Sequence, residues 1–96
     1  MNFTWDPRKE VANLAKHGVP FSEAQQAFDD PEAIVAFDEA HRPRGKHELR
    51  WWLLGKVGVR VMLVRYTHRP NGIIRILGAG YWEIGARLYE EKNRKL

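Results

Sequence analysis

Between Glu48 and Leu77 the apolar residues recur at every second position, and this period of two constrains the fold more than any other feature. Such alternation is typical of half-buried β-strands. Connections of two to five residues join strands that run in opposite directions, so a meander is predicted. The predicted strands are residues 48–54, 59–66 and 73–77. A hairpin at 55–58 joins the first two, and a turn at Pro70-Asn71-Gly72 precedes the third.

The first third of the chain has a different pattern. Phe3 to Trp5 predicts a short extended segment, and Asp6-Pro7 then has the N-cap and first-position residues of a helix. We expect this helix to end at Gly18. Its predicted apolar stripe consists of Val11, Leu14 and Ala15.

A second short helix is predicted after Pro20. Ser22 and Gln25 have the spacing of a capping box, and Asp29-Asp30-Pro31 ends the helix. Its predicted buried face consists of Ala24, Ala27 and Phe28. A strand at residues 33–37 and a solvent loop at 39–46 then lead to the meander.

A third helix is expected after Gly78-Ala79-Gly80, which would bend the chain out of the last strand. Tyr81, Ile84 and Leu88 form its apolar stripe. The element order predicts one α+β domain over residues 1–96: an antiparallel sheet of four to five strands with two N-terminal helices and one C-terminal helix, all on one face.

Composition excludes several classes of protein. The 96 residues include no cysteine, which excludes disulfides, thiolate metal sites and a cysteine nucleophile. No apolar run approaches the ~20 residues that span a bilayer. The first residues lack the basic flank and apolar run of a signal peptide. We therefore expect a cytoplasmic protein without membrane contact.

The net charge of +4 is unevenly distributed along the chain. Residues 1–41 hold three Lys or Arg against eight Asp or Glu, a balance of −5, and residues 42–96 hold thirteen against four, a balance of +9. A strongly basic half attracts phosphate polyanions. Two other interpretations stay open at this point: basic side chains that merely face water, and an acidic half that faces a basic partner.

Metal and nucleotide-cofactor sites are not predicted. His17, His41, His47 and His68 show no i,i+4 pairing. Gly78-Ala79-Gly80 lacks the third glycine of a dinucleotide-binding loop. We expect neither a metal nor a cofactor.

Basic side chains on the predicted strands are the strongest functional signal. Strand alternation places Arg50 on the face opposite Trp51, and Arg75 opposite Ile74. An arginine inside an apolar strand requires an ion pair or a polar cleft. The alternatives are a structural ion pair and a phosphate clamp. Metal-free RNA cleavage requires such a clamp together with a base and an acid. The strand arginines are Arg50, Arg60, Arg65, Arg69 and Arg75.

A set of motif residues extends over nearly the whole chain. Its N-terminal part is Trp5-Asp6-Pro7, Lys9, Asn13, Lys16-His17-Gly18-Val19, Phe21, Glu23-Ala24 and Phe28-Asp29-Asp30-Pro31. The later positions are Glu48, Arg50-Trp51, Gly55, Arg60, Thr67, Arg69 and Ile74-Arg75-Ile76. In these residues and their spacing the chain resembles the BrnT toxin family, which implies a RelE-like fold and a ribonuclease of a type II toxin–antitoxin system.

The resemblance also implies partners and site residues. A BrnA-like ribbon-helix-helix antitoxin would neutralise the protein, and operator DNA would be bound only through that complex. The substrate would be RNA, cleaved without a metal. We predict Arg50, Arg69, Arg75, His17 and Tyr81 as catalytic residues, and Lys16, Arg60 and Arg87 as RNA-binding residues.

One segment departs from the family pattern. Typical members read Ser-Ala-Arg followed by a very basic helix, where this chain reads Gly78-Ala79-Gly80 and then Tyr81-Trp82-Glu83. Tyr81 and Trp82 offer rings for base stacking in place of the missing charge, or pack the helix onto the sheet. The departure leaves two other functions open: a non-catalytic partner of an antitoxin-like or nucleic-acid-binding protein, and a basic RNA-binding domain outside any toxin context.

Overall fold

A computed structural model of the chain describes residues 1–39 and 49–94. Five strands form one sheet in the order β1-β5-β4-β3-β2. The strands are β1 (Asn2–Trp5), β2 (Ile34–Phe37), β3 (Arg50–Val57), β4 (Arg60–Arg69) and β5 (Ile73–Tyr81). The helices are α1 (Pro7–His17), α2 (Phe21–Ala24) and α3 (Glu83–Asn93), with 3₁₀ turns η1 (Gln25–Asp29) and η3 (Pro70–Gly72). The predicted α+β class and the meander are confirmed.

The sheet is mixed, and the prediction of a purely antiparallel sheet is wrong at one edge. The β2–β3, β3–β4 and β4–β5 pairs are antiparallel, whereas β1 pairs with β5 in parallel, Trp5 lying opposite Ile76. Short connections determine the direction of the meander strands. They say nothing about β1, whose partner is some seventy residues further along the chain.

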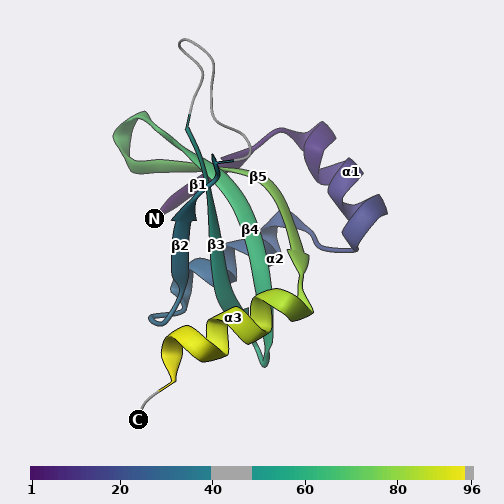
Figure 1. The fold of residues 1–96 in the computed structure, drawn as a ribbon. Coiled ribbons are helices and arrows are strands. Elements are labelled where there is room, and N and C mark those ends of the chain that lie inside the picture. The colour runs from purple at the N-terminus through teal and green to yellow at the C-terminus, as the bar shows by residue number, and fades with distance from the viewer. Residues whose placement is uncertain (40–48, 95–96) are drawn as a thin grey trace.

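Helices cover both faces of the sheet, not one face as predicted. Figure 1 shows α3 in front of β3 and β4 and α2 behind the sheet. The face toward α2 and η1, here the closed face, buries Phe21, Ala24 and Ala27 against Met62 and Ile76. The opposite face, here the open face, is covered by α3 through a smaller cluster of Leu54, Val61 and Tyr89.

Helix α1 has the predicted ends but not the predicted buried stripe. Asp6 accepts a hydrogen bond from the Arg8 amide at the N-cap, and Gly18 adopts the left-handed C-cap conformation. Val11 is 68% exposed and Leu14 is 42% exposed, whereas Asn13 is buried. The reason is that α1 packs against the edge of the sheet at β5, where backbone amides and carbonyls need hydrogen-bond partners. A polar side chain of α1 is therefore buried there in place of an apolar one.

The second predicted helix is a single α-helical turn that continues as a 3₁₀ turn. Pro20 occupies the N-cap position and makes no side-chain cap, and Ser22 is exposed, so the predicted capping box is absent. Phe21, Ala24 and Ala27 are fully buried, and Phe28 packs against them from a partly buried position. The second N-terminal helix is therefore shorter than expected.

The end of the chain also differs from expectation. Gly78 to Tyr81 continue β5, because their backbone pairs with β4 residues from Arg65 to Met62. Helix α3 therefore begins only at Glu83 and presents Gly85 and Tyr89 to the sheet. The predicted stripe points outward, since Ile84 is 61% exposed and Leu88 is 40% exposed.

The turns follow the glycine and asparagine positions. Gly58 has φ 64° in the β3–β4 hairpin, while Gly55 of the predicted hairpin is a buried residue of β3. Asn71 and Gly72 both adopt positive φ in the predicted turn before β5. The predicted loop at 39–46 lies mostly outside the described residues. Of the helices in the described part of the chain, none has the length and apolar character that a membrane crossing needs.

Candidate functional site

A row of polar side chains crosses the open face of the sheet. Arg50 of β3 is paired with Thr67 of β4, and Thr67 is paired with Arg75 of β5. Residues paired in this way project from the same face. Thr67 is 3% exposed and its Oγ1 donates to the Leu49 carbonyl at 2.8 Å, which fixes the centre of the row.

Strand β4 extends this cationic surface in both directions. Arg65 and Arg69 lie two residues on either side of Thr67 and so project from the same face. Trp51 and Ile76 project from the other face, where they pack in or against the core. The predicted alternation of arginine and apolar side chains is therefore confirmed. The arginine row is defined here as Arg50, Arg65, Arg69 and Arg75.

A pocket of about 590 Å³ adjoins the arginine row between α1 and the second half of β5. Its floor includes two cross-strand pairs of β4 and β5: Arg65 is paired with Gly78, and Leu63 is paired with Gly80. The two residues of each pair project from the same face of the sheet. Among residues 1–39 and 49–94, none of those that line the pocket is acidic. The lining residues are Lys9, Ala12, Asn13, Lys16, His17, Leu63, Arg65, Leu77, Gly78, Ala79, Gly80, Tyr81 and Trp82.

The α1 wall of the pocket is held in place by Asn13. Its Nδ2 donates to the carbonyls of Val19 and Ala79, both at 2.9 Å, and its Oδ1 accepts from the Ala79 amide at 3.1 Å. The side-chain amide thus forms hydrogen bonds with the backbone amide and carbonyl at the edge of β5, as a neighbouring strand would. This attachment places Lys16 and His17, four residues or fewer further along α1, at the pocket.

His17 lies directly above Gly80. A Cβ atom at position 80 would be 3.4 Å from Cγ of the His17 ring, which is ordinary contact distance. Lys16 and His17 also occupy the last turn of α1, where cations favour the helix dipole. The structural and chemical roles of these two residues are therefore compatible, and their predicted roles stay predictions.

Tyr81, Arg60 and Arg87 lie apart from the arginine row. Tyr81 borders the pocket, but its hydroxyl donates to Glu23 Oε2 at 2.8 Å and the Arg60 guanidinium stacks on its ring at 4.0 Å. Burial and the contact with Glu23 raise the pKa of Tyr81. Arg87 is exposed in the middle of α3. The geometry does not bring these three residues together with Arg50 and Arg75.

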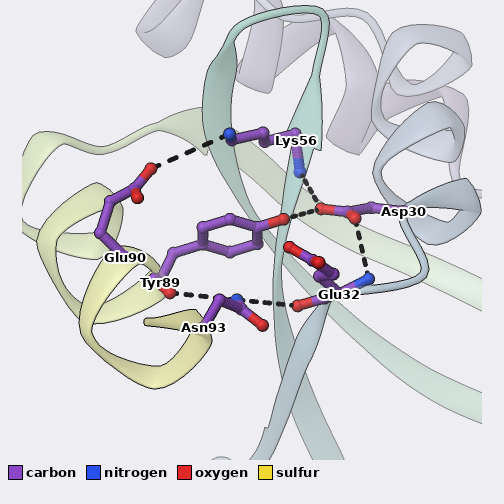
Figure 2. Close-up of polar contacts among 6 residues, drawn as sticks. All are labelled: Asp30, Glu32, Lys56, Tyr89, Glu90 and Asn93. Atoms are coloured by element: carbon purple, nitrogen blue, oxygen red, sulfur yellow. Dashed lines mark hydrogen bonds and ion pairs between the residues drawn. The ribbon is translucent and has the colours of Figure 1, made fainter. Parts of the chain in front are cut away.

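A second polar cluster attaches α3 to the rest of the molecule (Figure 2). The Tyr89 hydroxyl donates to Asp30 Oδ2 at 2.5 Å, and the same oxygen accepts from the Lys56 amide at 2.8 Å. Asn93 Nδ2 donates to the carbonyls of Glu32 and Tyr89 at 3.1 and 3.0 Å. These contacts tie α3 to β3 and to the turn before β2.

The electrostatics of this cluster follow from its hydrogen bonds. Burial by itself would raise the pKa of Asp30, but bonds from the Lys56 amide, the Tyr89 hydroxyl and the Glu32 amide outweigh it, so the pKa lies below 3.8. Burial, together with the bond to this carboxylate, raises the pKa of Tyr89 strongly. Asp30 thus stays ionised and holds α3, which in turn holds Trp82 beside the pocket.

Four charged, polar or aromatic residues that line the pocket were not among the predicted catalytic or RNA-binding residues: Lys9, Asn13, Arg65 and Trp82. Of these, Arg65 was considered only as a strand arginine and Trp82 only as a ring for stacking or packing. A signal existed for two of them. Arg65 alternates with Thr67 and Arg69, which places all three on one face. Lys9 and Lys16 are seven residues apart, which places both on one side of a helix. Within residues 1–39 and 49–94, no three His, Asp or Glu side chains gather into a group that could hold a metal ion.

Fold and site together define a class: a small α+β protein whose mixed sheet presents a cationic face and pocket suited to a polyanion. A sequence model of the family described as "Ribonuclease toxin, BrnT, of type II toxin-antitoxin system" matches residues 5–84. The chain belongs to this family, and the family implies a cognate antitoxin as partner. The predicted family is therefore confirmed, and neither this match nor the similar structure below favours the non-catalytic alternative.

A solved structure shares the fold. The crystal structure of the Brucella abortus ribonuclease toxin BrnT superposes with a TM-score of 0.64 at 21% sequence identity, covering 86% of this chain and 97% of that one. No curated protein sequence matches the chain significantly.

Proposed function

We propose that this chain cleaves single-stranded RNA on the open face of its sheet, without a metal ion. The observation that carries the proposal is the convergence of the arginine row, from three adjacent strands, beside a pocket lined by Lys16 and His17. Arg50 and Arg75 are two strand spacings apart, roughly 10 Å. Two long guanidinium side chains at that separation reach a common phosphate or two neighbouring ones.

The chemistry that fits these groups is transfer of a phosphodiester to the neighbouring 2′-hydroxyl. A base removes the 2′-proton, the 2′-oxygen bonds to phosphorus, and the bond to the 5′-oxygen breaks as an acid protonates that oxygen. Arg50, Arg69 and Arg75 stabilise the extra negative charge that phosphorus carries in the transition state. His17 serves as the acid or base, because an imidazole ring can both accept and donate a proton.

The remaining predicted residues take lesser parts in this proposal. Lys16 binds phosphate at the pocket. Arg60 and Arg87 bind flanking phosphates outside the arginine row. Tyr81 acts through its position between Glu23 and Arg60, since its hydroxyl is engaged by Glu23.

The partner and location follow the same proposal. A BrnA-like ribbon-helix-helix antitoxin neutralises the protein, and the complex binds operator DNA through the antitoxin. The protein acts in the cytoplasm, where its RNA substrate is found.

The test is cleavage in vitro and growth arrest in bacteria. Purified protein incubated with RNA in EDTA should produce fragments ending in 2′,3′-cyclic phosphate. Arg75→Ala should slow cleavage by about 10²- to 10³-fold, the loss typical of removing one transition-state donor, and should relieve growth arrest. Lys92→Ala, an exposed cation of α3 outside the row, is the matched control. Arrest that persists with Arg50, Arg69 and Arg75 all replaced would contradict the assignment.

A further inference from the structure

Two of the β5 residues that line the pocket beside the arginine row, Gly78 and Gly80, place no side chain in it. Gly78 and Gly80 are the β5 residues that face the open side there, paired with Arg65 and Leu63. Among the described residues, a Cβ at position 78 would come near Asn13 Oδ1, at 3.7 Å, and the three atoms nearest to a Cβ at position 80 all belong to the His17 side chain. The two glycines therefore leave a flat strip of backbone exposed between α1 and the start of α3.

One wall of the pocket is an indole ring held in a fixed position. Trp82 is 38% exposed, and its ring rests on Gly85 one turn into α3, where a Cβ atom would be 2.5 Å from Trp82 Cε3. Leu54 of the sheet packs against Gly85 as well, since a Cβ atom there would be 2.8 Å from Leu54 Cδ2. A ring that is immobilised on one side and exposed on the other is a platform for stacking.

The opposite wall carries positive charge. Lys9 and Lys16 lie one above the other on α1, with His17 beside them, and Arg65 joins the pocket to the arginine row. The ligand that matches a flat floor, an aromatic wall and a cationic wall is planar at one end and anionic at the other. A volume of about 590 Å³ accommodates one nucleotide.

We infer that this pocket is a subsite for one nucleotide of the RNA strand whose cleavage is proposed above, and the inference rests on that proposed function. The base lies over Gly78 and Gly80 against the Trp82 ring, and its phosphate contacts Lys9 and Lys16. The next phosphates of the strand then continue through Arg65 onto the arginine row. The glycines are thus the residues that open the subsite, because any larger side chain at position 80 fills it.

The inference is tested with an oligonucleotide that cannot be cleaved. A 2′-O-methyl RNA hexamer with one central 2-aminopurine reports affinity by anisotropy and stacking by fluorescence quenching. Trp82→Ala and Gly80→Leu should each weaken binding by about tenfold, within the range for loss of one stacked base, and should relieve part of the quenching. Lys92→Ala and Leu88→Ala, on α3 outside the pocket, should bind as the parent does.

Folding is controlled separately. Thermal unfolding of each variant shows whether the sheet is intact, and Trp82→Leu and Gly80→Ala serve as milder replacements where a stronger one unfolds the chain. Lys9→Gln with Lys16→Gln should reduce the salt dependence of binding, because two phosphate contacts are lost. Quenching and affinity that stay at the parental level in folded Trp82 and Gly80 variants overturn the inference.

Three outcomes separate this inference from the proposed function. If Arg75→Ala abolishes cleavage while the pocket variants bind the hexamer like the parent, the inference fails and the function stands. If the parent cleaves no RNA but the pocket variants lose hexamer binding, the function fails and the subsite stands. If the pocket variants lose only antitoxin binding, the pocket is a protein-docking site and the inference is overturned.

Discussion

The two faces of the sheet are made by the same alternating strands, yet they are covered in opposite ways. The closed face buries Phe21, Ala24 and Ala27 completely and continues into edge-to-face pairs such as Phe28 with Tyr66. The open face is covered by α3 over part of its area and presents the arginine row on the rest. The difference separates packing from charge: one face provides the larger core, and the other presents the arginine row.

Glycine-to-alanine substitutions on the two faces provide the largest contrast. A Cβ at Gly55, on the closed face, would collide with the carbonyl oxygen of Ala27, so Gly55→Ala should destabilise the fold by about 3 kcal/mol. The atoms nearest to a Cβ at Gly80, on the open face, belong to the exposed His17 side chain and lie at 3.4 Å or more. Gly80→Ala should change the stability by at most about 1 kcal/mol. Urea denaturation measures both, and equal losses would show that the open face is packed as tightly as the closed one.

The boundary between the two faces depends on Asn13. Asn13→Ala should lower the free energy of unfolding by about 2 kcal/mol, because the buried Ala79 amide and the carbonyls of Val19 and Ala79 lose their partner. Chemical denaturation gives the value, and faster hydrogen exchange at the Ala79 amide identifies the site. Exposed Leu14→Ala on the same helix is the control. If Leu14→Ala lowered the free energy of unfolding and Asn13→Ala did not, the proposed role of Asn13 at the edge of β5 would be wrong.

The attachment of α3 should be weaker than either of these. Tyr89→Phe keeps the buried ring but removes the hydrogen bond to Asp30, so the expected loss is about 1 kcal/mol. The loss is measured by thermal unfolding followed by circular dichroism. Glu90→Gln removes only an exposed 3.9 Å ion pair with Lys56 and serves as the near-neutral comparison. An equal loss for the two substitutions would show that the hydrogen bond to Asp30 adds no more to the stability than the exposed ion pair does.

The smallest effect is a dependence on acid. Because the pKa of Asp30 lies below 3.8 in the folded state, its contribution is complete above pH 3.8 and is lost as the pH falls through the lower folded value. The stability of the parent should therefore decrease on acidification, and Asp30→Asn should flatten part of that slope. Unfolding measured from pH 5 to pH 2 tests this, and parallel curves for the two proteins would contradict it.

Much of the fold was predictable because local rules decide it. The Asp6-Pro7 start and Gly18 end of α1, the Asn71-Gly72 turn and the alternation that separates Arg50 from Trp51 depend only on neighbouring residues. The helix stripes were mispredicted for a physical reason. Apolar periodicity assumes that a helix packs on a hydrophobic surface, whereas α1 lies at a strand edge and buries Asn13 instead.

The sequence by itself determined the family, the meander and the arginines that share one face, since a signature and a period of two are local properties. Only the tertiary structure decided that β1 joins β5 in parallel, that α3 lies opposite α2, and that Gly78 and Gly80 are strand residues flooring a pocket. Those features depend on contacts between segments up to seventy residues apart. Such contacts arise from the packing of the whole chain, which no short stretch of it encodes.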